Sequence, residues 1–244
     1  MRTSRLIFAI AALSLAIGFA CQKAKYVPAP ASITVVHAMF NGNATSIVPK
    51  FGSDTAGRYY AGPTYGSTMV SVGYGGAQLY SIVAGTTPLL VVPFTDTTFK
   101  IFNGSMNLQS GSIYSFFLSG DTAHADTMLV QDNIPYYADS SAGIRFINLT
   151  VGGKAITINL SSDSTLTPIA TLGYRQITDF MKYAATAATD AAGGSYSFDI
   201  RDQATGDILN TFNWSYSRFK NNTLVISGST DPGSTPDLFT IANY

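Results

Sequence analysis

The residues best suited to chemistry are few in this chain and widely separated. Cys21 is the only cysteine, and His37 and His124 are the only histidines. His37 ends an apolar segment, whereas His124 lies between Asp121 and Asp126 in a loop-forming sequence. Neither histidine belongs to a pair with the ligand spacing of a helix or hairpin, so we expect no metal site and no cofactor. We expect a structural role for His37 and a solvated loop around His124, with weak cation binding there as the alternative.

Cys21 closes an N-terminal segment that has the layout of a secretory signal. Arg2 and Arg5 precede an almost wholly apolar stretch at residues 6–19, and Ala20 places a small residue before the cysteine. The apolar stretch is too short to span a bilayer as a stable anchor. The segment therefore predicts export of the chain and removal of residues 1–20.

A cysteine at this position resembles the lipobox of bacterial lipoproteins, in which the sulfur accepts a diacylglycerol and the freed amine accepts a further acyl chain such as palmitate. The resemblance implies that Cys21 is the lipidated first residue of the mature protein. Gly18 departs from it, because the lipobox prefers a leucine-like residue there. Each buried methylene contributes about 0.8 kcal/mol, so two or more chains anchor stably. The alternative is an ordinary secretory signal that leaves a free thiol, a liability in an oxidising compartment.

The composition of the chain favours strands joined by tight turns. Charged residues make up 11% of the sequence, against a typical share of about 25%, and all 14 acidic residues are aspartate. Glutamate forms helices readily, whereas Asp, Asn, Ser and Gly favour turns, so the absence of glutamate argues for strands. Loss of residues 1–20 would leave 12 basic against 14 acidic residues, which argues against a nucleic-acid partner.

A weak internal repeat follows the extended linker QKAKYVPAPAS. Similar segments recur in the same order at offsets of 100 to 111 positions: residues 33–42 with 144–153, 74–85 with 174–185, 84–92 with 192–200, 118–120 with 226–228, and 126–133 with 237–244. Because the offset varies while the order persists, the copies differ in loop length and not in strand order. The sequence therefore predicts two copies of one domain.

We expect an all-β chain of two tandem antiparallel immunoglobulin-like β-sandwich domains, each of a size that suits about seven short strands. The expected segments are a signal peptide at residues 1–20, a linker at 21–32, and domains at 33–139 and 140–244. Alternation and β-branched or aromatic enrichment predict strands at residues 33–37, 69–72, 89–92, 99–102, 113–118 and 128–131, and at 144–149, 155–160, 196–201, 211–216, 223–227 and 238–242. The turn DQATGD at residues 202–207 predicts a hairpin.

Four segments carry a resemblance to a known family. IRFINL, YRQITDFM, GSYSFDIRDQATGDIL and NTLVISG, which begin at residues 144, 174, 194 and 222, resemble the domain of unknown function 4397 family of secreted bacterial proteins. The first copy is similar but more divergent. The family's Ser-Pro-Asp-rich turn after the first strand is replaced by MFNGN and TVGGK. The resemblance implies an exported β-sandwich, often in tandem, without assigned catalytic residues.

We predict no catalytic residues. The sequence has no G-x-S-x-G elbow and no Gly-rich phosphate loop in a strand-to-helix setting. Two aspartates could serve a glycosidase, but nothing selects a pair. Tyrosines instead suggest a binding site, because Tyr59, Tyr60 and Tyr65 cluster near Tyr74 and Tyr80 and exposed rings stack on sugars. The alternative is that these rings fill the core and rims of the sandwich.

Short Asp-Ser/Thr sites resemble the acceptors of a periplasmic O-glycosylation system, although turn composition alone generates such sites. They begin at Asp54, Asp96, Asp121, Asp126 and Asp163.

The leading functional hypothesis is a non-enzymatic exported lipoprotein that presents a tandem β-sandwich for protein or glycan interaction at the cell envelope. We expect attachment to the outer membrane through Cys21. The sequence does not decide between the periplasmic face and the surface face of that membrane. The alternative is a glycan-binding component of a polysaccharide uptake system. An enzyme is the third class, and it would need a pocket with convergent aspartates of perturbed pKa.

Overall fold

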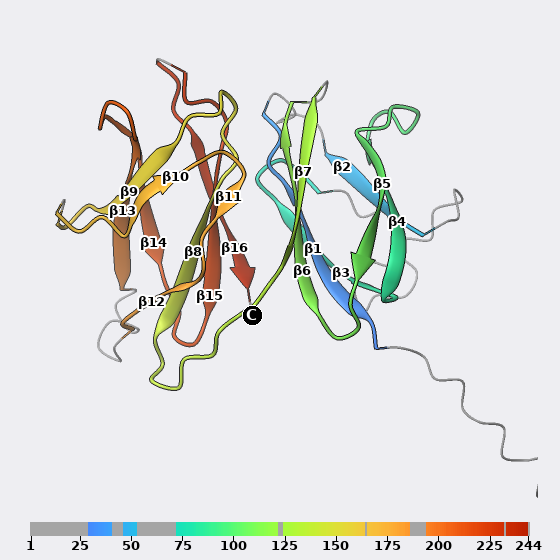
Figure 1. Cartoon of the computed structure of the whole chain (residues 1–244), viewed down its shortest axis with the longest axis horizontal. Coiled ribbons are helices and arrows are strands. Elements are labelled where there is room, and N and C mark those ends of the chain that lie inside the picture. Colours follow the sequence, from blue (N-terminus) through green and yellow to red (C-terminus); the bar gives the residue numbers. More distant parts are fainter. Residues whose placement is uncertain are drawn as a thin grey trace, which may run out of the picture.

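The computed structural model describes residues 29–40, 46–52, 72–121, 124–163, 165–185, 194–231 and 233–243. These residues form sixteen strands and no helix, which confirms the all-β class (Figure 1). Within them, no helix long and apolar enough to cross a membrane is found. The signal segment with Cys21, most of the linker, and the three tyrosines Tyr59, Tyr60 and Tyr65 lie outside the described residues.

The N-terminal half consists of two sheets around one apolar core. The first sheet has the order β3-β1-β6-β7 and comprises β1 (Ala31–His37), β3 (Ala77–Ile82), β6 (Ile113–Gly120) and β7 (Ala125–Gln131). The second has the order β2-β4-β5 and comprises β2 (Ile47–Phe51), β4 (Gly85–Pro93) and β5 (Phe102–Leu108). Ile33, Leu89 and Phe116 are among the side chains that fill the space between the sheets.

The C-terminal half follows the same plan. One sheet has the order β11-β8-β15-β16, with β12 also paired to β8, and comprises β8 (Ala142–Asn148), β11 (Gln176–Ile177), β12 (Met181–Tyr183), β15 (Asn221–Ser227) and β16 (Asp237–Asn243). The other has the order β10-β9-β13-β14 and comprises β9 (Ile156–Leu160), β10 (Ile169–Leu172), β13 (Ser195–Asp202) and β14 (Ile208–Ser215). Ile144, Phe198 and Trp214 belong to the enclosed core.

The internal repeat is preserved in the register of the strands. β1 lies beside β6 with His37 opposite Leu118, and β8 lies beside β15 with Asn148 opposite Ile226. The paired residues are related by the offsets of 111 and 108 that the sequence predicts. Both pairs are parallel, whereas we expected antiparallel sheets throughout. The parallel pairing arises because the chain leaves β1 or β8, adds strands to both sheets of its sandwich, and then returns beside that strand in the original direction.

The first sheets of the two halves pack face to face, which gives four layers of sheet (Figure 1). The apolar cluster between them contains Val36, Ala38 and Phe117 from one half and Ile147, Leu149, Val225 and Ile241 from the other. Neighbouring residues of one strand therefore enter different cores: Val35 faces its own sandwich and Val36 faces the other half. Burial on both faces is reflected in consecutive apolar residues within β1, β6, β8 and β15, at 35–36, 116–118, 146–147 and 224–226.

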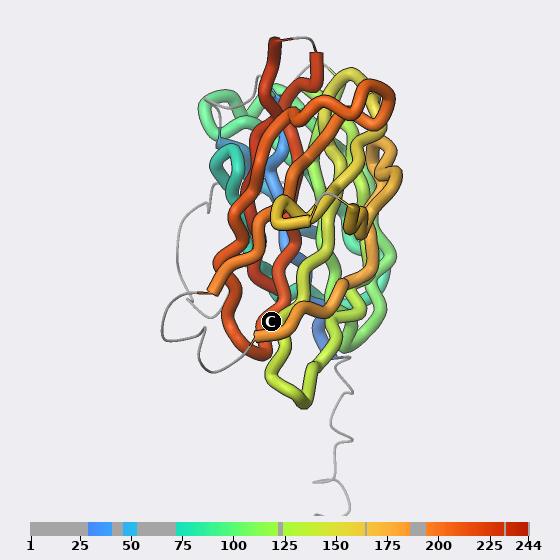
Figure 2. Tube along the Cα trace, turned by 90° about the vertical axis from the view of Figure 1, so that its left-hand side faces the viewer, coloured from blue at the N-terminus to red at the C-terminus, as the bar shows by residue number. Residues whose placement is uncertain are grey.

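Corresponding strands of the two halves run in the same direction. We call the end at which β1, β6, β8 and β15 finish the distal end, and the end at which they begin the proximal end. In Figure 2 the C-terminal half lies in front of the N-terminal half, with the strands of both running along the same direction. The connection between β7 and β8, which contains the predicted boundary at residues 139 and 140, crosses at the proximal end. The immunoglobulin-like assignment stays a prediction.

One predicted strand is wrong and several short strands were not predicted. Residues 99–101 lie in a loop, and β5 begins only at Phe102. The reason is a turn upstream, in which Asp96 Oδ1 accepts hydrogen bonds from the backbone N–H and hydroxyl of Thr98, at 3.0 and 2.6 Å. Strands β2, β3, β10, β11 and β12 were not predicted as strands, although the repeat alignment did match the segment of β3 to that of β11 and β12.

Candidate binding cleft

A cleft of about 380 Å³ opens at the distal end of the C-terminal half. Three connections converge there: β8 to β9, the turn between β13 and β14, and β15 to β16. Polar side chains dominate its lining, which includes Lys154, Asp202, Thr205, Asp207, Thr230, Asp231, Ser234 and Thr235. Because each connection starts or ends on a strand of the rigid sandwich, the fold brings residues as distant in sequence as Lys154 and Asp231 to one place.

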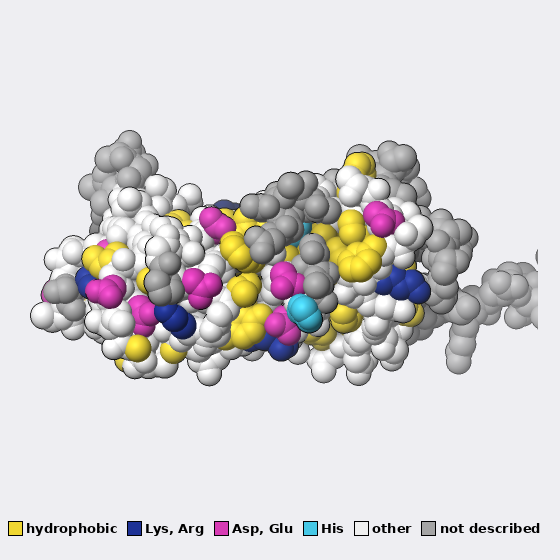
Figure 3. Space-filling model, turned by 90° about the horizontal axis from the view of Figure 1, so that it is seen from above, with side chains coloured by type: hydrophobic (Ala, Val, Ile, Leu, Met, Phe, Trp, Pro, Cys, Tyr) yellow, Lys and Arg dark blue, Asp and Glu magenta, His cyan; other side chains and the backbone are white. Residues whose placement is uncertain are grey.

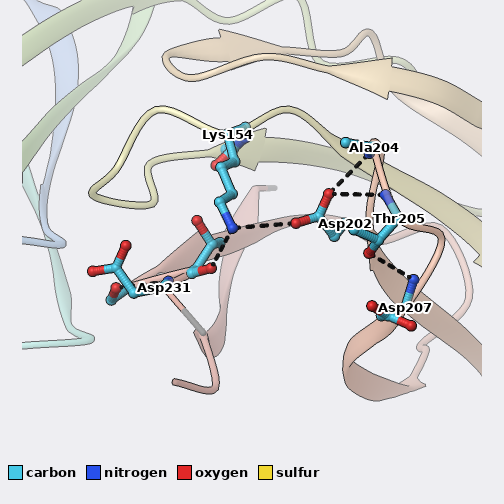
Figure 4. A network of polar contacts seen from close by, with 9 residues as sticks. Lys154, Asp202, Ala204, Thr205, Asp207 and Asp231 are labelled. Carbon is cyan, nitrogen blue, oxygen red and sulfur yellow. Dashed lines mark hydrogen bonds and ion pairs between the residues drawn. The ribbon is translucent and has the colours of Figure 1, made fainter. Parts of the chain in front are cut away.

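Lys154 and Asp202 form the fixed part of the cleft. Lys154 Nζ lies 3.4 Å from Asp202 Oδ2 and donates to the backbone oxygen of Thr230 at 3.2 Å (Figure 4). Asp202 Oδ1 accepts the backbone N–H groups of Ala204 and Thr205, at 2.8 and 3.4 Å. These hydrogen bonds, with that of Ala204 foremost, hold the pKa of Asp202 below its usual value. Asp202 thus stays anionic and holds the lysine at the mouth of the cleft.

Asp207 and Asp231 supply two exposed carboxylates beside this pair (Figure 4). Asp207 is oriented by its turn, because its backbone N–H donates to Thr205 Oγ1 at 3.3 Å. Thr230 is only 1% exposed, and its hydroxyl has no hydrogen-bond partner within the structure. The cleft therefore combines carboxylate acceptors, a lysine donor and an unsatisfied hydroxyl.

An aliphatic wall completes the cleft. Ile208, at the start of β14, is 52% exposed, and Leu209 lines the same space. Among the described residues no group of three or more His, Cys, Asp or Glu side chains is arranged to hold a metal ion. Polar groups beside an apolar wall suit a ligand that has many hydroxyls and an apolar ring face, because carboxylates accept from hydroxyls while the aliphatic side chains cover carbon.

The structure places the predicted residues that it describes in structural roles. His37 is fully buried, with its ring edge-on to Tyr74 at 5.8 Å, and its Nδ1 accepts the backbone N–H of Met39 at 3.4 Å, which confirms the expected structural role. His124 is exposed and lies 3.4 Å from Asp121, as expected of a solvated loop. Tyr80 packs against Phe51 at 5.1 Å inside the first core, as the core-filling alternative predicted.

Tyr74 has a role that the sequence did not indicate. Its hydroxyl donates to Asp237 Oδ2 at 2.5 Å and lies 3.1 Å from Ser227 Oγ, both in the C-terminal half. Burial and then the hydrogen bond to Asp237 raise the pKa of Tyr74 to about 12. Asp237 directly follows the connection that carries Asp231 and Ser234, so Tyr74 of one half contacts the start of β16 in the other.

The comparisons with known proteins identify no family. No family model and no curated protein matches the chain, so the resemblance to the domain of unknown function 4397 family stays a prediction. The chain is similar to a family 26 carbohydrate-binding module from Eubacterium rectale, solved in complex with maltoheptaose, at 11% identity and a TM-score of 0.30, over 88% of this chain and 97% of that one.

Two further similarities are weaker still. The Bacillus anthracis TIE protein matches at 9% identity and a TM-score of 0.25, over 83% of this chain and 34% of that one. A Bacteroides uniformis protein proposed to act in cell adhesion matches at 7% identity and a TM-score of 0.22, over 88% of this chain and 98% of that one. Similarities of this size say nothing about what the cleft binds.

Proposed function

We propose that this chain is a non-enzymatic, lipid-anchored binding protein of the bacterial cell envelope, and that its distal cleft binds a glycan. One observation carries the proposal: the cleft opens at the distal end. The chain enters β1 at the opposite, proximal end, as Figure 1 shows. An anchor at Cys21 would therefore hold the molecule by the end remote from the cleft. Such an arrangement presents a ligand site away from a membrane.

The chemistry of the cleft favours a neutral or cationic glycan. Asp207 and Asp231 can each accept hydrogen bonds from neighbouring sugar hydroxyls, and Lys154 can donate to a ring or hydroxyl oxygen. Ile208 can pack against the apolar face of the ring. Three carboxylates against one lysine disfavour a polyanionic ligand, because unlike charges must meet at a binding surface.

A glycan array tests the binding part of the proposal. We expect the processed protein to give signals on a subset of neutral or amino sugars, and Asp207→Asn with Asp231→Asn to remove them. Asp139→Asn is the matched control, because this aspartate lies in the connection between β7 and β8 at the other end of the molecule. Absence of any signal, or signals that survive in the double variant, would refute the cleft as a glycan site.

The anchor has a separate test. Protein made in a bacterial host that is fed radiolabelled palmitate should incorporate the label, and Cys21→Ser should abolish incorporation. The intact mass should correspond to a chain that begins at Cys21 and carries acyl groups. An unlabelled protein with a free Cys21 thiol would instead support an ordinary secretory signal.

The alternative of a polysaccharide uptake component depends on the same cleft. It would be favoured by tight binding of long polysaccharide over short oligosaccharides, and by a gene neighbourhood that encodes transporters and hydrolases. A protein partner would instead be indicated if envelope proteins, and no glycan, competed for the distal end.

A further inference from the structure

The proximal end carries an exposed aromatic pair. Tyr136 and Phe219 are 77% and 43% exposed, and their rings stack with centroids 6.2 Å apart and an interplanar angle of 13°. They come from the connection between β7 and β8 and from the loop between β14 and β15. Val83 and Ile113, which are 62% and 40% exposed, lie where β3 ends and β6 begins, at the same end of the N-terminal half. Large apolar side chains are thus open to solvent on the proximal side of both halves.

Basic residues surround the aromatic pair. Arg218 and Lys220 flank Phe219, and the Arg218 guanidinium lies 5.7 Å from the centre of that ring and donates to Ser140 Oγ at 2.8 Å. Lys182 lies on β12, opposite Gly143 near the start of β8.

Two carboxylates at this end are paired with cations. Asp139 is exposed, and Lys182 Nζ lies 2.6 Å from it. Asp179, also exposed, lies closer to the middle of the molecule, beside residues 144–146 of β8. Asp132 is buried and paired with Arg145 at 2.7 Å.

The distal end has the opposite charge. Its connections carry Asp121, Asp207 and Asp231, and the strand ends beside them carry Asp126, Asp202 and Asp237. Of these, Asp126 and Asp202 are paired with Arg175 and Lys154. Figure 3 looks onto this end and shows acidic side chains spread across both halves, with fewer basic ones. The molecule is therefore polarised along its strands, with a basic and aromatic proximal end and an acidic distal end.

We propose that the proximal end docks onto the surface of a bilayer that contains anionic phospholipid. Tyrosine and phenylalanine side chains partition into the interface between headgroups and acyl chains, and arginine and lysine are attracted to an anionic leaflet. Acidic residues at the distal end would be repelled by the same leaflet, so the charge distribution selects one orientation. Docking would hold the distal cleft away from the bilayer.

The place where the chain enters β1 supports a bilayer as the surface that contacts the proximal end. The inference rests on the proposed lipid anchor, since seven residues separate Cys21 from Ala29 and the eight Cα–Cα steps between them can span at most about 28 Å. An anchored molecule therefore keeps its proximal end close to the bilayer. Lys23 and Lys25 lie in this short segment and add to the basic character of the tether sequence.

Vesicle co-sedimentation tests docking without the anchor. The probe is a chain of residues 22–244, which retains every described strand, mixed with phosphatidylcholine vesicles that either contain or lack phosphatidylglycerol. We expect binding that requires phosphatidylglycerol and weakens with salt. Arg218→Gln with Lys220→Gln should reduce binding by at least about fivefold. Tyr136→Ser with Phe219→Asn should also reduce it, and Asn tolerates the φ of 62° at position 219.

The control variants lie at the other end of the molecule. Phe94→Ser with Phe99→Ser removes two exposed rings from the connection between β4 and β5 and should leave vesicle binding unchanged. Similar melting temperatures would show that all variants fold. Lack of phosphatidylglycerol-dependent binding, or equal binding by the proximal variants, would overturn the inference. Self-association that is lost with Tyr136→Ser, without vesicle binding, would assign the patch to a second copy of the chain.

The docking proposal and the anchor proposal can be refuted independently. Palmitate incorporation without vesicle binding would leave the anchor standing and overturn docking. Vesicle binding without palmitate incorporation would support docking and refute the anchor.

Discussion

Tyr74 and Tyr174 occupy equivalent positions in the two repeats, and each donates a hydrogen bond to an aspartate of the other repeat. Tyr74 binds Asp237 at 2.5 Å, and Tyr174 binds Asp126 at 2.6 Å. The two aspartates are themselves equivalent, at an offset of 111. Each tyrosine also approaches an equivalent serine of the other repeat, Ser227 at 3.1 Å or Ser119 at 3.4 Å.

The apolar part of the interface is also formed by equivalent residues of the two repeats. Three pairs of equivalent residues meet in the cluster between the two halves: Val36 with Ile147, Ala38 with Leu149, and Phe117 with Val225. The same surface of each repeat is thus used on both sides, as in a two-fold symmetric dimer. Covalent linkage makes the association intramolecular, so it does not depend on protein concentration. The interface joins the halves into one body that carries the cleft.

Removal of the tyrosine hydroxyls tests this interface. We expect Tyr74→Phe and Tyr174→Phe each to lower the free energy of unfolding by about 1–2 kcal/mol, because a hydrogen bond to a carboxylate is lost in each case. The two losses should be nearly additive if the sites are independent. Urea denaturation provides the measurement. Tyr136→Phe, at an exposed ring, is the control and should stay within about 0.5 kcal/mol of the wild type; an equal loss in this control would refute a specific role.

Alkaline pH should weaken the same interface. The pKa of Tyr74 is raised to about 12, above the ordinary value of 10.0, so the folded state favours the protonated phenol. Its contribution to stability is therefore fully present below pH 10 and is lost as the pH rises from 10 towards 12. The difference in free energy of unfolding between wild type and Tyr74→Phe should shrink over this range. A difference that stays constant to pH 12 would contradict the prediction.

The proximal end of the interface breaks the symmetry. Arg145 donates to Asp132 Oδ1 at 2.7 Å and to Thr223 Oγ1 at 2.8 Å, and both charged side chains are at most 4% exposed. The equivalent positions in the other repeat hold Thr34 and Asn243, which are uncharged. One buried ion pair therefore exists where the two-fold relationship would allow two.

A double-mutant cycle tests the coupling of this pair. Asp132→Asn and Arg145→Thr, which introduce the residues of the other repeat, should each cost about 3–5 kcal/mol because the partner is left as an uncompensated buried charge. The double variant should cost less than either single one. Chemical denaturation at neutral pH measures all four proteins. Additive losses would show that the two groups do not act as a pair.

The turn at Asp202 should matter for both folding and binding. Asp202→Ala removes the acceptor of two backbone N–H groups and leaves Lys154 without its carboxylate. We expect a loss of about 1–2 kcal/mol in the free energy of unfolding. Because the pKa of Asp202 is lowered, its contribution is present above pH 4 and is lost as the pH falls through the folded-state pKa. Unchanged acid stability in Asp202→Ala would contradict this role.

The sequence predicted the repeat and most long strands because both depend on apolar patterning. The strands predicted at residues 144–149 and 223–227 correspond to β8 (Ala142–Asn148) and β15 (Asn221–Ser227), although their parallel pairing was not predicted. The interface was missed, although consecutive apolar residues in β1 and β8, at 35–36 and 146–147, were a signal of burial on two faces. Nothing in the types of Tyr74 and Asp237 shows that they meet, because they are 163 positions apart and belong to different repeats.

The cleft was also hidden from the sequence. Asp202 and Asp207 lie in DQATGD, which reads as an ordinary turn, and Asp231 lies in another turn-forming segment. Their convergence depends on how three connections are spaced at one end of a sandwich, which local patterning does not encode. Tyr80 shows the converse, because a tyrosine from a cluster that suggested binding is buried in the core.

Calorimetric titration of the strongest array glycan into the wild type and into Asp207→Asn with Asp231→Asn tests the central claim most directly. The account predicts saturable binding by the wild type and at least about a tenfold weaker affinity in the double variant, equivalent to about 1.4 kcal/mol. Equal affinities in the two proteins would contradict it, because the ligand would then be held elsewhere on the molecule.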